Sequence, residues 1–249
     1  MLIIYNYKMK IIHNEKPNLN LPEFKVDMKL SKYLDEDPLL KHLNKSFCCA
    51  LISRAGGGKT SLLVGLLNTK KKLNKVFHKI YVFMPNTSRQ SMKDSIFDVL
   101  PEDQLFEGVN FENLANVYNK LLENSQEEKL SLLIFDDCQS QFKEKEVEIN
   151  LLHIIANRRH LRTSIFIIAQ NYNKIPKQIR LALTDTFLFN IGKQEYDNIY
   201  EENVEISKPD YEEILKLFND IKKDDPYSFL FIHEKNKFFI NWNEIIEDD

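Results

Sequence analysis

The sequence predicts an α/β fold with a central, mostly parallel sheet flanked by helices, and a C-terminal β-hairpin. An apolar run at residues 47–52 is followed by a glycine-rich loop and then by leucines at helical spacing. A second apolar run, 130–137, ends in two aspartates, and a third, 163–169, is followed by a glutamine. Because parallel strands present their carboxyl ends at one edge of a sheet, these three points are expected to meet.

Composition sets limits on the class of protein. The chain has 249 residues, 43% of them hydrophobic, which suits one α/β domain with a sizeable core. Its net charge of −3 gives no overall basic field, so contacts with nucleic acid would need a local patch or a ring of subunits. No apolar run approaches the roughly 20 residues of a membrane span. Cys48, Cys49 and Cys138 form no C-x-x-C pair, so we expect free thiols in a soluble, intracellular protein.

The glycine-rich loop has the sequence SRAGGGKT and lies between the first strand and a helix, the context of a phosphate-binding loop. Lys59 is expected to reach the β- and γ-phosphates, and the Thr60 hydroxyl to bind Mg²⁺. Ser53 replaces the usual first glycine. The residues predicted to contact the nucleotide are Ser53, Arg54, Ala55, Gly56, Gly57, Gly58, Lys59, Thr60 and Ser61.

Polar residues at the ends of two further strands complete the predicted site. Asp136 would hold Mg²⁺, directly or through water, and Asp137 would act as base or orienter for the attacking water. Gln170 would sense the γ-phosphate or position that water. The alternatives without a functional role are that the two aspartates only open a turn and that Gln170 is an ordinary amide at a strand end.

The order of these elements favours a motor-type ATPase. The strand at 79–84 lies between Lys59 and Asp136 in sequence. This fits a sheet with an extra strand inserted between the glycine-loop strand and the carboxylate strand. A GTPase would carry an N-K-x-D base reader, and Asn173-Lys174-Ile175-Pro176 lacks the aspartate.

The remaining chain is predicted from periodicity and turn residues. Helices are expected at 86–100, 111–124, 146–159 and over most of 195–222, a strand at 186–191, and a hairpin from 228–233 and 237–242. Residues 1–16 could form a strand, and the acidic tail at 244–249 is expected to fray. The predicted divisions are a lead-in at 1–46, the ATPase core at 47–191, and C-terminal helices and hairpin at 192–249 packed on that core.

Basic residues outside the glycine loop allow two interpretations each. Arg158 and Arg159 either place favourable charge at a helix C-terminus or supply an arginine finger to a neighbour's ATP, with Arg159 the preferred finger. Lys174, Lys177 and Arg180 either contact phosphates in a channel or lie on a solvated surface.

Three motifs, SRAGGGKT, LLIFDD and NRRHLRTSIFIIAQNYNKIPKQIR, resemble the genome-packaging ATPases of large nucleocytoplasmic DNA viruses and their virophages, in the FtsK/HerA superfamily. The resemblance covers residues 47–191. It implies a RecA-like fold, Walker A roles for Lys59 and Thr60, Walker B roles for Asp136 and Asp137, a sensor role for Gln170, and it supports Arg159 as the finger.

The same resemblance implies a homo-oligomeric ring of about five or six subunits that pumps double-stranded DNA into a capsid. Its partners would be capsid or portal-vertex proteins, and its location the virus factory in the host cytoplasm or the virion. The chain shows no separate nuclease or DNA-guiding domain, which leaves DNA contacts to the core or to partners.

The leading functional hypothesis is therefore an ATP-driven translocase for genome packaging. One alternative is a nucleotide or nucleoside kinase with Arg158, Arg159 and Arg162 as lid arginines. The inserted strand and Gln170 argue against it. A second alternative is a non-catalytic nucleotide-binding assembly protein, which has no need of the Asp137 carboxylate.

Overall fold

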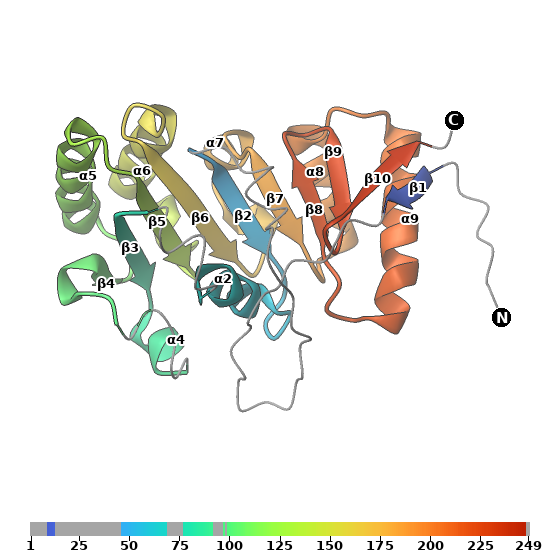
Figure 1. Ribbon diagram of the computed structural model, residues 1–249, viewed down its shortest axis with the longest axis horizontal. Coiled ribbons are helices and arrows are strands. Elements are labelled where there is room, and N and C mark those ends of the chain that lie inside the picture. The colour runs from blue at the N-terminus through green and yellow to red at the C-terminus, as the bar shows by residue number, and fades with distance from the viewer. Residues whose placement is uncertain (1–8, 13–45, 69–76, 92–96, 98, 248–249) are drawn as a thin grey trace.

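The fold is built on a sheet of ten strands. The computed structural model describes residues 9–12, 46–68, 77–91, 97 and 99–247. In this part of the chain the strands lie in the order β1-β10-β9-β8-β7-β2-β6-β5-β3-β4 (Figure 1). Their bounds are β1 Met9–Ile12, β2 Cys48–Ile52, β3 Lys79–Met84, β4 Leu105–Glu107, β5 Ser131–Asp136, β6 Thr163–Ala169, β7 Asp185–Leu188, β8 Leu230–His233, β9 Lys237–Ile240 and β10 Asn243–Glu247.

The strands from β7 to β4 in this order are parallel. β2 pairs with β6 and β7, and β5 pairs with β6 and β3. The extra strand expected between the glycine-loop strand β2 and the carboxylate strand β5 is present, and it is β6. The strand at 79–84 is β3, on the far side of β5. This order brings the carboxyl ends of β2, β6 and β5 to neighbouring positions at one edge of the sheet.

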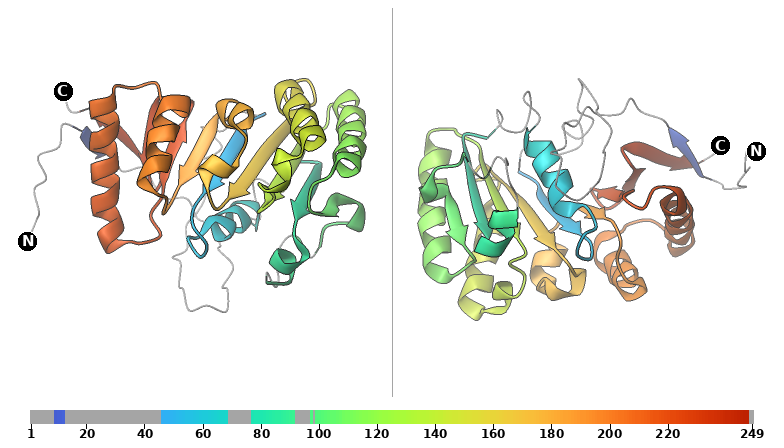
Figure 2. Two further views of the ribbon diagram at one scale, coloured as in Figure 1. Left: turned by 180° about the vertical axis from the view of Figure 1, so that it is seen from behind. Right: turned by 90° about the horizontal axis from the view of Figure 1, so that it is seen from below.

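Each face of the sheet is covered by helices. Along β2, Cys48, Ala50 and Ile52 pack on one side, and Cys49 and Leu51 on the other, as the pleat of a strand requires. Figure 2 shows α2 on one face and α5 to α9 on the other. The helices are α2 Lys59–Asn68, α4 Asn86–Ser91, α5 Phe111–Gln126, α6 Lys145–Asn157, α7 Lys177–Leu181, α8 Lys193–Asn203 and α9 Lys208–Asp224.

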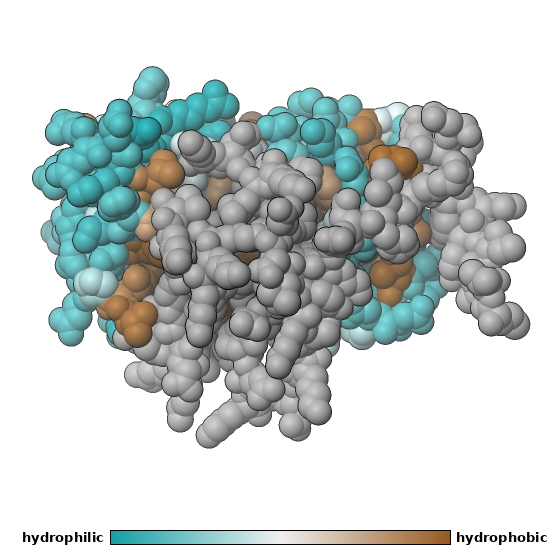
Figure 3. Space-filling model, viewed as in Figure 1, coloured by the Kyte–Doolittle hydropathy of each residue, from teal (hydrophilic) through white to brown (hydrophobic). Residues whose placement is uncertain are grey.

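Helix α5 shows how the sequence pattern produces these layers. Asn110 caps its start, where the side-chain oxygen accepts the Asn113 N–H at 2.8 Å. Leu114, Val117 and Leu121 follow at helical spacing and are fully buried. The described surface around α5 is mainly hydrophilic (Figure 3). The helix predicted at 111–124 is confirmed and extends to Gln126.

The other half of the sheet is antiparallel and rich in aromatic residues. The predicted hairpin is present as β8 and β9, which pair with each other and, through β8, with β7. The Phe231 ring stacks on Phe187, with ring centroids 4.3 Å apart, and Trp242 packs edge-on against Phe229 at 5.0 Å. This aromatic cluster lies on the same face of the sheet as α2.

The prediction that residues 244–249 fray was wrong for 244–247, and residues 248–249 lie outside the described residues. β10 runs from Asn243 to Glu247 and pairs with β9 and β1, so its backbone groups are hydrogen-bonded on both sides. Ile245 is buried, with 9% of its surface exposed. Apolar burial and the two ladders order this acidic segment.

Two further boundaries differ from expectation. Of the helix predicted at 86–100, α4 is described over Asn86–Ser91, residues 92–96 and 98 lie outside the described residues, and Val99 and Leu100 lie in a bend. The last parallel strand, β7, ends at Leu188 rather than at Ile191. Of the predicted strand at 1–16 only β1 is described, and the lead-in at 17–45 lies outside the described residues. Within the described chain, every helix is too short or too polar to cross a membrane.

Candidate active site

The glycine-rich loop connects the end of β2 to the start of α2 and is anchored on both sides. The Ser53 N–H donates to the Ala169 carbonyl at 3.2 Å, and the Arg54 N–H donates to the Asn190 carbonyl at 3.1 Å. Gly56 and Gly58 have φ values of +72° and +91°, a region that side chains rarely tolerate. The sequence therefore needs glycine at these two positions for the loop to curve around a phosphate.

Ser53, which stands where the usual motif has glycine, explains why a third position of the loop, Gly57, is also glycine. A Cβ on Gly57 would lie 1.8 Å from the Ser53 Oγ, so Gly57 cannot carry a side chain while Ser53 is present. The Ser53 Oγ is buried, and it has no hydrogen-bond partner in the described chain. A small residue can thus take the first position of the loop because Gly57 leaves room for it.

The Lys59 ammonium is held inside the loop. Its Nζ donates to the Ser53 carbonyl at 2.7 Å and to the Arg54 carbonyl at 3.1 Å. Burial lowers the pKa of Lys59, while Asp136 and Asp137 oppose that shift. These carbonyls are neutral acceptors, and an anionic phosphate would be a stronger partner for the ammonium group.

The two aspartates at the end of β5 have different environments. Asp136 is the last residue of the strand and is 5% exposed. Burial, and then the neighbouring Asp137, raise the pKa of Asp136 to about 6, and Lys59 opposes this. Asp137 follows the strand with φ of +56°, and its N–H donates to the Ile168 carbonyl of β6 at 3.1 Å. This hydrogen bond attaches Asp137 to the neighbouring strand.

Two amides hold the Asp137 carboxylate. Gln170, directly after β6, donates from Nε2 to both carboxylate oxygens, at 3.0 Å and 2.8 Å. Gln139 donates to one of them at 3.1 Å. The Gln139 Oε1 is buried and has no partner among the described residues. Sequence reasoning expected Gln170 near the aspartates, which the structure bears out, but missed Gln139, although it follows Asp137 by only two positions.

These residues fit a magnesium nucleotide. The described chain contains no group of three or more His, Cys, Asp or Glu residues that could enclose a metal ion. Magnesium in nucleotide sites is held mainly by phosphates, water and one or two protein oxygens. Burial and the neighbouring Asp137 both raise the pKa of Asp136, and a cation bound there would oppose both effects, as Lys59 does in part.

Arg158 and Arg159 lie at the opposite edge of the sheet. Both precede β6, whereas Gln170 follows it, and the seven residues of this strand span about 20 Å. Arg158 donates to the Ser46 carbonyl at 2.8 Å and to the Ile155 carbonyl at 3.0 Å, so it closes the end of α6. Arg159 is exposed. Neither arginine lies near the glycine loop of its own subunit.

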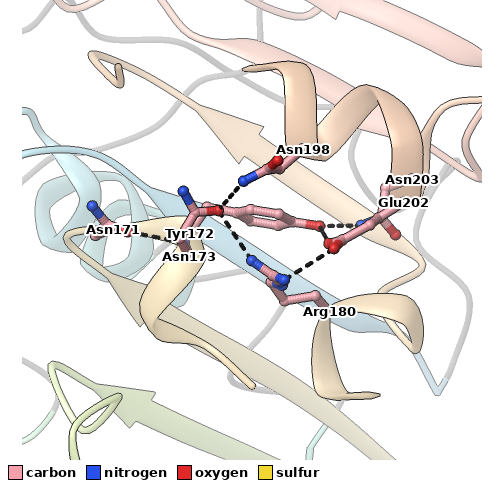
Figure 4. A network of polar contacts seen from close by, with 7 residues as sticks. All are labelled: Asn171, Tyr172, Asn173, Arg180, Asn198, Glu202 and Asn203. Atoms are coloured by element: carbon pink, nitrogen blue, oxygen red, sulfur yellow. Dashed lines mark hydrogen bonds and ion pairs between the residues drawn. The ribbon is translucent and has the colours of Figure 1, made fainter. Parts of the chain in front are cut away.

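Arg180 is part of a buried network and does not line a surface. Its Nη2 pairs with the Glu202 carboxylate at 2.9 Å, its Nη1 donates to Asn173 at 3.0 Å, and its guanidinium lies 4.9 Å from the Tyr172 ring centroid. The Tyr172 hydroxyl donates to Glu202 at 2.8 Å, and Asn198 joins the network through Asn173 (Figure 4). The suggestion that Arg180 contacts phosphates in a channel is therefore wrong.

This network attaches the segment after Gln170 to α8. Glu195 of α8 accepts the Tyr172 N–H at 2.7 Å and the Gly192 N–H at 2.9 Å. The backbone N–H of Tyr172, two residues after Gln170, is thus held by a side chain of α8. This role of Glu195 could not be predicted from the sequence, because the contact joins positions 23 residues apart.

The parallel sheet with β6 between β2 and β5, and the glycine loop that leads into α2, define a RecA-like P-loop NTPase. More particularly, the chain belongs to the poxvirus A32 protein family, whose sequence profile matches residues 35–244. Membership of this family confirms the resemblance to viral packaging ATPases.

Individual relatives agree with this assignment. The chain is 29% identical over 161 residues to the DNA packaging protein OPG160 of variola virus and of vaccinia virus strain Copenhagen. The match covers 63% of this chain and spans only 58% of the length of those relatives.

Solved structures show the same fold. The genome packaging NTPase B204 from Sulfolobus turreted icosahedral virus 2, in complex with ATP-gammaS, is similar with a TM-score of 0.55 at 16% identity over 80% of this chain and 98% of that one. The DNA-packaging ATPase B204 from Sulfolobus turreted icosahedral virus gives 0.54 at 16% identity, over 78% and 96%.

Proposed function

We propose that this protein is an ATP-driven motor subunit that moves double-stranded viral DNA into a capsid. The observation that carries the proposal is the meeting of Lys59, in a phosphate-binding loop, with Asp137 and Gln170 at the ends of neighbouring strands. The names of the OPG160 and B204 proteins, which describe DNA packaging, support it.

The loop residues would bind the triphosphate. Among residues 53–61, the Ser53 and Arg54 N–H groups anchor the loop, so the phosphates would be surrounded mainly by the N–H groups at the start of α2. Lys59 would exchange its two loop carbonyls for phosphate oxygens. The Thr60 hydroxyl and the Asp136 carboxylate would hold Mg²⁺, which would supply positive charge to the phosphates. That charge would also favour the ionised form of Asp136.

Asp137 would remove a proton from the attacking water. A carboxylate has about four acceptor positions, so the bonds from Gln170 and Gln139 leave room for one from water. The unpartnered Gln139 Oε1 can accept the second hydrogen of the same water. Gln170 keeps the carboxylate oriented, and its position at the end of β6 lets it respond to the γ-phosphate.

Assembly of several subunits would bring an arginine finger to each ATP site. Because Arg159 precedes β6 and the glycine loop lies at the other end of this strand, about 20 Å along it, Arg159 can act as a finger only on a neighbouring subunit, as in a ring of about five or six copies. Capsid or portal-vertex proteins would hold that ring in the virus factory or the virion. Residues 47–191 would form the motor core, with 1–46 and 192–249 as additions to it.

The kinase alternative loses support from the structure. Arg158, Arg159 and Arg162 all lie at the edge of the sheet opposite the glycine loop, and Arg162 lies 3.6 Å from Glu128 there. They cannot close over phosphates bound in the same subunit.

Steady-state ATP hydrolysis, measured with and without double-stranded DNA at low and moderate salt, tests the proposal. We expect DNA to stimulate hydrolysis and Asp137→Asn to abolish it. Hydrolysis that is indifferent to DNA would contradict a translocase. Transfer of phosphate to an added nucleoside or nucleotide would support the kinase hypothesis instead.

A further inference from the structure

The two ends of a bound nucleotide must lie on opposite sides of the glycine loop. β2, which carries the loop, lies between β6 and β7. The hydrolytic residues Asp137 and Gln170 follow β5 and β6, so the γ-phosphate end faces that side. The base, at the other end of the phosphate chain, must therefore lie over the side of β7 and β8.

An exposed aromatic side chain lies on that side. Among the large hydrophobic residues that are exposed in the described chain, only Tyr227 and Phe111 are aromatic, and Tyr227 is 36% exposed. A Cβ placed on Gly58 would lie 3.8 Å from the Tyr227 ring and 3.7 Å from the Phe189 ring. The connection between α9 and β8, which carries Tyr227, runs beside the glycine loop (Figures 1 and 2).

The turn that carries Tyr227 is held by hydrogen bonds. The Tyr227 N–H donates to the Asp225 carboxylate at 3.2 Å, and the Ser228 hydroxyl donates to the same carboxylate at 3.1 Å. Asn241 donates to the Ser228 hydroxyl at 2.7 Å and accepts the Phe229 N–H at 3.0 Å. The ring is therefore presented from a fixed backbone, which lowers the entropic cost of using it as a binding surface.

Positive charge accompanies the ring. The Lys222 ammonium donates to the Phe189 carbonyl at 3.3 Å, at the end of α9 nearest the glycine loop. Arg54 is exposed in the loop itself, and its charge adds to burial in lowering the pKa of Lys222. Two cations that repel each other beside an aromatic ring suit a ligand that combines a flat base with phosphate groups.

On the basis of the nucleotide-binding function proposed above, we propose that Tyr227 is the platform on which the base of the bound nucleotide stacks. The ligand class is a nucleoside triphosphate. Because every base has a π-face, stacking on Tyr227 contributes affinity with little choice between adenine and guanine. Lys222 and Arg54 lie on the same side and attract the phosphates nearest the ribose.

Binding measurements on the full chain test this proposal, with ATPγS and inorganic tripolyphosphate as the probes in the presence of Mg²⁺. The second probe occupies the phosphate site but has no base. We expect Tyr227→Ala to weaken ATPγS binding about tenfold and to leave tripolyphosphate binding unchanged. Tyr227→Phe keeps the ring and should bind both probes as the unmodified protein does. Phe111→Ala, at an exposed aromatic on α5, is the matched control.

The outcomes separate this inference from the proposed function. If the Tyr227→Ala variant binds ATPγS normally, or binds both probes more weakly by the same factor, Tyr227 is not a stacking platform, while the proposed nucleotide binding is unaffected. If the unmodified protein binds neither probe, the proposed function fails and the platform fails with it.

Discussion

Where the parallel strands end, the side chains are charged or carry amides, and Gln139 and Gln170 both donate hydrogen bonds to the Asp137 carboxylate. On the antiparallel strands they are aromatic, and Phe231 stacks on Phe187 and packs against Phe239. The two halves of one sheet thus collect different residues. Parallel strands leave polar groups at one edge, where they form the site, while the antiparallel half contributes mainly buried area. Substitution of Asp137, in the parallel half, should reduce the rate of ATP hydrolysis, and substitution of Phe231, in the antiparallel half, should reduce the free energy of unfolding.

The largest effect is expected at Asp137. Asp137→Asn removes the proton acceptor but keeps the shape of the side chain, so we expect the rate of ATP hydrolysis to fall about 10³-fold. Thermal stability and ATPγS binding should change little. Glu201→Gln, at an exposed carboxylate on α8, is the control and should leave the rate unchanged. Comparable rates for the two variants would remove Asp137 from catalysis.

Phe231 tests the other half. Phe231→Ala deletes a fully buried ring from the aromatic cluster, and we expect a loss of about 3 kcal/mol in the free energy of unfolding. Urea denaturation measures this loss. At a temperature where the variant is folded, its affinity for ATPγS should match that of the unmodified protein. A selective loss of nucleotide affinity without loss of stability would break the comparison.

The network around Arg180 joins the two halves, because it fixes the segment after Gln170 on α8. Glu202→Gln leaves the guanidinium of Arg180 without its buried counter-charge, and we expect a loss of about 2 kcal/mol in the free energy of unfolding. Arg180→Met should cost a similar amount.

The double variant sharpens this test, since it removes both charges together. Its loss in the free energy of unfolding should be smaller than the sum of the two single losses. Losses that simply add would show that the pair is not coupled.

A smaller, pH-dependent effect is expected at Asp136. The pKa of Asp136 is raised to about 6 in the folded state, so this state keeps a proton that the unfolded chain loses at lower pH. The contribution to stability is full below about pH 4 and is lost as the pH rises through about 6. Without Mg²⁺, Asp136→Asn should therefore raise the free energy of unfolding by on the order of 1 kcal/mol at neutral pH, and by much less near pH 4.

Urea denaturation of Asp136→Asn and of the unmodified protein at both pH values, without Mg²⁺, measures that difference. A gain that is equal at acid and neutral pH would contradict the raised pKa.

The sequence predicted the parallel half better than the antiparallel half, for physical reasons. The strands 79–84 and 163–169 are confirmed residue for residue as β3 and β6, because buried parallel strands are continuous apolar runs. β10 was not predicted because its partner β1 lies more than 200 residues away in sequence. The glutamates of β10 also make the segment around Ile245 look polar in sequence. Tertiary pairing rather than local pattern determines that strand.

The same distinction applies to the site. Lys59, Asp136 and Gln170 could be predicted because each is next to a strand end that the sequence reveals. Glu195 and Tyr227 could not, since one acts through a backbone contact from α8 and the other through a turn after α9. The only signal for Tyr227 was an aromatic residue next to a proline in a turn.

In the function proposed for this protein, ATP hydrolysis at this site moves the protein along double-stranded DNA. Displacement of a labelled third strand from a DNA triplex measures such movement directly. We predict displacement by the unmodified protein with ATP, and none with ATPγS or in the Lys59→Ala variant. Displacement that proceeds equally without ATP, or no displacement by a preparation in which DNA stimulates hydrolysis, would contradict the claim.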